Sequence, residues 1–117
     1  MPSTVLIVDD HAGFRANARA VLESEGFQVV GEVANGTDAV AEVARLSPQI
    51  VLLDVQLPDA DGFELAERLT SNGSRVNVVL VSSRDYSDLP RLIERSGARG
   101  FVPKAELSGP RLAALVA

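Results

Sequence analysis

The chain has 117 residues, of which 46% are hydrophobic and 23% charged, and its formal net charge is −5. This length fits one domain with a core of its own, and the negative charge argues against non-specific attraction to nucleic acid or to an anionic membrane surface. There is no cysteine, which excludes disulfides, thiol catalysis and cysteine-ligated metal centres. No segment approaches the roughly 20 apolar residues that span a bilayer, so we expect a cytoplasmic protein.

The first half of the chain alternates strand and helix signals. The apolar run Val5–Val8 predicts a first strand, and residues 11–25 carry apolar side chains at helical spacing. Residues 27–33 predict a second strand, followed by a turn at residues 35–36 and a helix with Thr37 as its candidate N-cap. The side chains expected to face inward from that helix are Ala39, Val40, Val43, Ala44 and Leu46.

The second half repeats this alternation. Strands are expected at 49–53, 76–82 and 99–102, and helices near 63–70, around 89–93 and at 106–116. Pro90 fits the first turn of the helix around 89–93, where a missing backbone N–H costs least.

Five strand–helix pairs without internal repeats or linkers indicate an α/β fold. The expected architecture is a doubly wound (βα)5 flavodoxin-like sandwich, with a five-stranded parallel sheet in the order 2-1-3-4-5. Residues 1–117 should form this one domain, with no output domain within the chain.

Polar residues of different chemical kinds stand where four of the predicted strands end. They are Asp9 and Asp10 after the first strand, Asp54 after the third, Ser82 at the end of the fourth and Lys104 after the fifth. In such sheets ligands bind outside the carboxyl ends of the strands, at the point where the strand order reverses. That point lies between the first and third strands, so the three carboxylates should face each other across it.

Three carboxylates in one pocket need a reason to stay ionised, because each pair repels by about 1 to 4 kcal/mol depending on the local dielectric. Mg²⁺ supplies one, since it takes oxygen ligands and commonly binds through one or two carboxylates plus a phosphate. A single Asp at a strand end is more often a helix cap or a turn residue. The convergence of three with Lys104, which adds a cation, and Ser82, which adds a hydroxyl donor, indicates a site for phosphoryl chemistry.

These residues, in this order, resemble the response-regulator receiver (CheY-like) domain of two-component signalling over essentially the whole chain. The matching stretches are Asp9-Asp10, residues 54–62 (DVQLPDADG), Ser82 and residues 101–104 (FVPK). The resemblance implies a phosphorylation-dependent signalling switch whose phosphoryl donor is a sensor histidine kinase. It implies no enzymatic activity beyond self-catalysed phosphoryl transfer and autodephosphorylation. A downstream protein partner would bind the face of the fourth helix, fifth strand and fifth helix, with no direct binding to nucleic acid or membrane.

The same resemblance assigns roles to five positions of the predicted sheet edge. Asp54 would accept the phosphoryl group, and Lys104 would contact it. Asp10 and Asp54 would ligate Mg²⁺ directly, together with the backbone carbonyl of Gln56, while Asp9 would act through a water molecule.

A switch pair is also implied, formed by Ser82 and Phe101. The hydroxyl would move toward the phosphoryl group and the ring would rotate into the space it leaves. Two other interpretations stay open: Phe101 as an ordinary half-buried strand aromatic, and Ser83 as the relevant hydroxyl. The chain departs from many relatives at Ala105, where they carry proline. His11 directly follows the acidic pair; it could add pH sensitivity, but a position in the first turn of a helix is the preferred interpretation.

Two other functions deserve comparison with a stand-alone switch. A phosphatase with an Asp nucleophile and Mg²⁺ would, on the haloacid-dehalogenase pattern, need an Asp acid/base where Gln56 stands. The chain could instead be the receiver portion of a truncated helix-turn-helix transcriptional regulator, although it contains no basic recognition helix.

Overall fold

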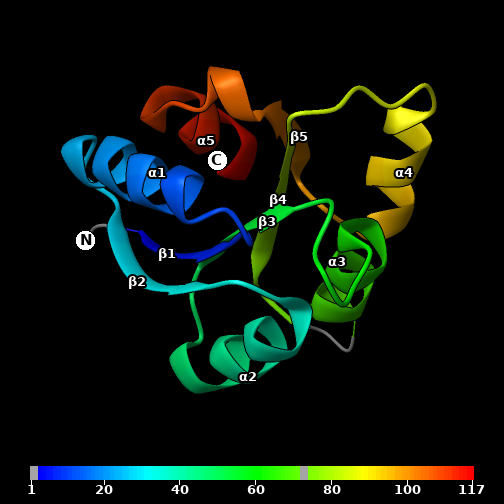
Figure 1. Cartoon of the computed structure of the whole chain (residues 1–117), viewed down its shortest axis with the longest axis horizontal. Helices are drawn as coiled ribbons and strands as arrows, with labels where there is room; N and C mark the ends of the chain where they lie inside the picture. Colours follow the sequence, from blue (N-terminus) through cyan, green and yellow to red (C-terminus); the bar gives the residue numbers. More distant parts are fainter. Residues whose placement is uncertain (1–2, 72–73) are drawn as a thin grey trace.

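A five-stranded parallel sheet with the order β2-β1-β3-β4-β5 organises the molecule (Figure 1). The computed structural model describes residues 3–71 and 74–117. The strands are β1 (Thr4–Val8), β2 (Gln28–Val33), β3 (Ile50–Asp54), β4 (Asn77–Ser82) and β5 (Gly100–Pro103). The predicted doubly wound fold and its strand order are confirmed, and each predicted strand lies within about one residue of the observed one.

Helices cover both faces of this sheet. They are α1 (Ala12–Ser24), α2 (Gly36–Leu46), α3 (Gly62–Thr70), α4 (Leu89–Ser96) and α5 (Gly109–Val116), with a 3₁₀ turn at Lys104–Glu106. Helices α1 and α5 lie on one face and α2 and α3 on the other, while α4 lies beside α3 (Figure 1). Within the described residues, no helix has the length and apolar character needed to cross a membrane.

The unbroken apolar runs follow from burial of the central strands on both faces. In β1, Val5 and Ile7 pack into the core under α1 and α5, whereas Leu6 and Val8 pack into the core under α2 and α3. Alternate side chains of one strand therefore enter different cores, and both must be apolar.

Two expectations for α2 were wrong. The N-cap is Asn35, whose side chain accepts the Asp38 N–H at 2.8 Å, and not Thr37. The Thr37 hydroxyl instead donates to Asp59 at 2.9 Å, so a residue distant in the sequence decides which polar side chain caps the helix. Ala44, expected to face inward, is exposed because the buried stripe runs through Ala39 and Val43 and leaves it on the solvent side.

The last helix starts later than predicted. Residues 106–116 were expected to be helical, but α5 begins at Gly109 and the chain before it makes the 3₁₀ turn. Ser108 caps α5 by accepting the Arg111 N–H at 3.2 Å, and Pro110 occupies the first turn. The prediction for Pro90 in the first turn of α4 is confirmed.

Candidate functional site

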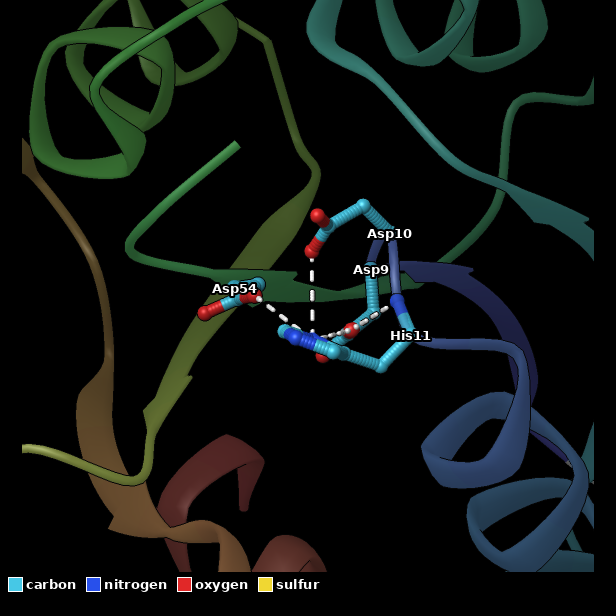
Figure 2. Close-up of side chains that lie close together, drawn as sticks. All are labelled: Asp9, Asp10, His11 and Asp54. Carbon is cyan, nitrogen blue, oxygen red and sulfur yellow. Dashed lines mark hydrogen bonds and ion pairs between the residues drawn. The ribbon is translucent and has the colours of Figure 1, made fainter. Parts of the chain in front are cut away.

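The acidic residues meet because β1 and β3 are neighbours in register. Val8 pairs with Leu53, so Asp9 and Asp54 continue adjacent strands at the same edge. Asp9 is 0% and Asp54 3% exposed, whereas Asp10 turns to the surface. Figure 2 shows these three carboxylates and the His11 ring pointing toward one another. The structure thus brings together the three acidic residues that the sequence analysis placed at this edge.

Lys104 reaches the acidic residues from the end of β5, which lies two strands away from β3 in the sheet. Its Nζ lies 2.6 Å from Asp9 Oδ2 and 3.4 Å from Asp54 Oδ2. The ammonium also sits 4.7 Å from the centre of the Phe14 ring, which holds the side chain over the site. Lys104 is the only lysine in a chain that uses arginine for every other permanent cation. The site therefore takes a compact point charge instead of a planar guanidinium.

The charge balance of the site works against an ionised Asp54. Burial raises the pKa of Asp54, and the nearby Asp9 charge raises it further, while the Gln56 N–H bond and Lys104 lower it. The Gln56 N–H donates to Asp54 Oδ1 at 3.2 Å. Among the described residues, the buried Asp9 Oδ2 accepts no hydrogen bond of ordinary geometry, and the close ammonium is its counter-charge. A further cation would relieve this excess of negative charge.

The donor atoms fit a divalent metal ion. One ligand atom each from Asp9, Asp10, His11 and Asp54 lies within 4.8 Å of the others. Carboxylate oxygens are ligands that Mg²⁺ prefers, so the donor types of Asp9, Asp10 and Asp54 fit this ion.

The position of His11 differs from the predicted one. It is the N-cap residue of α1 and not part of its first turn, and its ring turns into the acidic cluster. Nδ1 lies 3.0 Å from Asp9 Oδ1, 3.2 Å from Asp10 Oδ1 and 4.0 Å from Asp54 Oδ2. The sequence feature that could have predicted this place is that His11 directly follows the acidic pair.

The loop that follows Asp54 is fixed by close backbone contacts. The Gly62 N–H donates to the Val55 carbonyl at 2.6 Å, and a Cβ on Gly62 would lie 2.5 Å from Val55 Cα. The Asp61 carboxylate caps α3, and Asp59 accepts hydrogen bonds from the start of α2. These contacts fix the conformation of the backbone that directly follows Asp54.

The two hydroxyl candidates differ in burial. Ser82 is 3% exposed and its Oγ accepts the Arg84 N–H at 3.0 Å, whereas Ser83 is exposed. The register pairs Ser82 with Pro103, next to Lys104, at the same edge as Asp54. This burial favours Ser82 as the hydroxyl of the site.

Phe101 belongs to a cluster of three aromatic rings. It is half-buried and meets Tyr86 edge-on at 6.4 Å between ring centres, and Tyr86 meets Phe63 in the same way at 5.4 Å. The Tyr86 hydroxyl is buried and has no hydrogen-bond partner among the described residues. No periodic pattern covers the loop in which Tyr86 lies, so its contact with Phe101 could not be predicted from the sequence.

A doubly wound sheet that carries paired acidic residues, a buried aspartate and a lysine at its switch-point edge defines the receiver class of signalling domains. The profile of the response regulator receiver domain matches residues 5–116, and the chain belongs to this family.

Similar proteins agree with this assignment. The chain is 40% identical over 106 residues to the "virulence factors putative positive transcription regulator BvgA" of Bordetella pertussis, covering 91% of this chain and 51% of that protein. It is 33% identical over 101 residues to the response regulator UvrY of Escherichia coli, covering 86% of this chain and 46% of that protein. The receiver domain of a putative response regulator, NarL, from Mycobacterium tuberculosis superposes with a TM-score of 0.87 at 28% identity, covering 97% and 96% of the two chains. The chain thus spans about half the length of the two regulators.

Proposed function

We propose that this protein is a phosphorylation-dependent switch that accepts a phosphoryl group on Asp54 from a sensor histidine kinase. The observation that carries the proposal is the buried Asp54 carboxylate, which lies 3.4 Å from the Lys104 ammonium and beside the Asp9-Asp10 pair. A nucleophile held next to a cation and a candidate metal site is suited to phosphoryl transfer, which depends on positioning and charge neutralisation.

Four residues of the edge would hold Mg²⁺ in this proposal. Asp10 and Asp54 would ligate it directly with the Gln56 backbone carbonyl, and Asp9 would act through water. Mg²⁺, when bound, would neutralise charge between the carboxylates and the phosphoryl oxygens. The donor distances of the acidic cluster support this assignment.

The transfer itself exchanges one bond to phosphorus for another. An Asp54 carboxylate oxygen attacks the phosphorus of a phosphohistidine, the P–O bond forms as the N–P bond breaks, and the imidazole leaves with that electron pair. The attack needs an ionised carboxylate, whose formation burial opposes and Lys104 favours. The Ser82 hydroxyl, which now accepts the Arg84 N–H, keeps its own proton to donate to a phosphoryl oxygen. Self-catalysed transfer and hydrolysis would be the only chemistry of the domain.

The change at the site would reach the surface through Phe101. In the proposed switch, Ser82 moves toward the phosphoryl group and Phe101 rotates inward, which would rearrange the ring contacts with Tyr86. A downstream protein partner would then read the face of α4, β5 and α5. We place the protein in the cytoplasm, where its kinase partner would act.

A second form of the same function has its own support. The relative that is 40% identical over 106 residues is named a transcription regulator. We therefore infer that the domain is the receiver part of a regulator that carries a DNA-binding segment. The reading frame beyond residue 117 distinguishes this form from a stand-alone switch.

Intact-mass measurement after incubation with acetyl phosphate and Mg²⁺ tests the proposal. The wild-type chain should gain one phosphoryl group, and it should gain none without Mg²⁺. Asp54→Asn should stay unmodified, whereas Asp59→Asn is the matched control, because Asp59 lies in the next loop and binds the start of α2. An adduct that persists in Asp54→Asn would refute the assignment.

A further inference from the structure

His11 is the one side chain of the acidic cluster to which the resemblance assigns no role. It occupies the N-cap of α1 but makes no side-chain capping bond within the described chain, although this position favours Ser, Thr, Asp or Asn. Its side chain is 67% exposed, so it does not fill the core. The ring therefore serves neither the helix end nor the packing, and it is turned toward the carboxylates.

The distances around Nδ1 match those between ligands of one metal ion. In an octahedral site with ligands at about 2.1 Å, adjacent ligand atoms lie about 3.0 Å apart and opposite ones about 4.2 Å. Nδ1 lies 3.2 Å from Asp10 Oδ1 and 4.0 Å from Asp54 Oδ2, close to an adjacent and an opposite pair. The two carboxylates are the proposed direct ligands, so Nδ1 lies at ligand-to-ligand distances from both of them.

Asp9 holds the ring in this place. Its Oδ1 accepts the His11 backbone N–H at 2.8 Å and lies 3.0 Å from Nδ1. Without a metal ion, a proton on Nδ1 would be donated to the Asp9 and Asp10 carboxylates. When a cation takes the place of this proton, the ring would carry its proton on Nε2. In this tautomer the lone pair of Nδ1 is available to a metal.

We propose that His11 Nδ1 is a ligand of the cation at this site, which gives an otherwise all-oxygen site one nitrogen donor. The inference rests on the metal site of the proposed function and adds a preference to it. Binding exchanges one metal-bound water for Nδ1, with no change of oxidation state. Imidazole nitrogen suits Mn²⁺, Co²⁺ and Ni²⁺ better than Mg²⁺, so His11 raises the affinity for these ions relative to Mg²⁺.

The test uses the fact that His11 is the only histidine. Untagged protein labelled with ¹⁵N in histidine, and loaded with Mn²⁺, should show a ¹⁵N coupling in pulsed electron paramagnetic resonance. Calorimetric titration should show that His11→Ala weakens Mn²⁺ binding by about tenfold or more, and Mg²⁺ binding by a smaller factor. Circular dichroism and the urea midpoint of the variant report whether it is folded, and the labelled wild type needs no substitution at all.

Three results would overturn the inference: bound Mn²⁺ without ¹⁵N coupling, equal losses for the two ions, or tighter Mn²⁺ binding in His11→Ala. The last would mean that the ring occupies the place of the cation. The acetyl phosphate assay on wild-type protein is run beside these measurements. An adduct with Mg²⁺ but no ¹⁵N coupling refutes only the role of His11, whereas no adduct and no cation binding refute the proposed function as well.

Discussion

Lys104→Met should destabilise the domain far more than loss of an ordinary surface cation. Its Nζ lies 2.6 Å from Asp9 and 3.4 Å from Asp54, and the three side chains are 14%, 0% and 4% exposed. At an effective dielectric constant near 20, these distances correspond to gross attractions of about 6 and about 5 kcal/mol. Desolvation cancels much of this, and removal of one partner from a buried pair typically costs 3–5 kcal/mol. We expect a loss of about 3 kcal/mol at neutral pH, because Asp54 can escape part of the penalty by taking up a proton.

Urea unfolding of Lys104→Met and wild type, without divalent metal, measures this loss. Arg111→Met is the matched control, since it removes a cation 2.7 Å from Glu106 in a pair whose members are 48% and 52% exposed. That change should cost at most about 1 kcal/mol. Saturating Mg²⁺ should stabilise Lys104→Met more than wild type, because the ion no longer competes with the ammonium. A loss no greater than that of Arg111→Met would refute the reasoning.

Four further outcomes follow from the site. Asp10→Ala should weaken Mg²⁺ binding in calorimetry more than Asp9→Ala, since we assign Asp10 as a direct ligand; equal losses would count against that assignment. Gly62→Ala should cost about 1–3 kcal/mol in urea unfolding and slow phosphorylation by acetyl phosphate, because the added methyl group collides with the backbone that follows Asp54. Asp54→Asn should be more stable than wild type at neutral pH without metal. The pKa of Asp54 is raised in the native state, so between the ordinary pKa of an Asp and this raised pKa the native state binds more protons than the unfolded state. The stability of the wild type therefore falls as the pH rises through this range. Urea midpoints that vary with pH identically in the two proteins would contradict this. Tyr86→Phe should gain about 1 kcal/mol, because it removes a buried hydroxyl without a partner among the described residues; a destabilised variant would indicate a partner that the hydroxyl does bind.

The sheet and its functional edge could be predicted from the sequence because both depend on local patterns. Strands β1, β3 and β4 are buried on both faces, so their apolar runs are unbroken. The site then follows from topology, since polar residues at the ends of neighbouring parallel strands must share an edge. No side-chain conformation is needed for either step.

The rest depends on contacts between residues far apart in the chain. Asn35 and Thr37 are both good capping residues. The Thr37 hydroxyl bonds to Asp59, which lies 22 positions further along the chain, and this contact cannot be predicted from local sequence. The His11 ring direction depends on an exposed rotamer at a helix end, which no periodicity specifies. Tyr86 lies in an irregular loop, and only the folded structure places its ring between Phe63 and Phe101.

Strand β5 connects the proposed phosphoryl site to the aromatic cluster, because Phe101 lies on it and Lys104 follows it. At rest, Lys104 is held by Asp9 and Asp54 while Phe101 packs on Tyr86. A phosphoryl group on Asp54 would offer new charge-assisted bonds to Lys104 and Ser82, each worth about 1.5–3 kcal/mol. The ion pair between Lys104 and Asp9 must weaken before Lys104 can bond to the phosphoryl group. Lys104 therefore contributes to the shift only the difference in free energy between these two interactions. A net gain of about 1.4 kcal/mol is enough for a tenfold change in population. The strength of the proposed switch therefore depends on the bond that Ser82 gains and on the exchange of partners by Lys104. A weaker resting pair between Lys104 and Asp9 would give a stronger response.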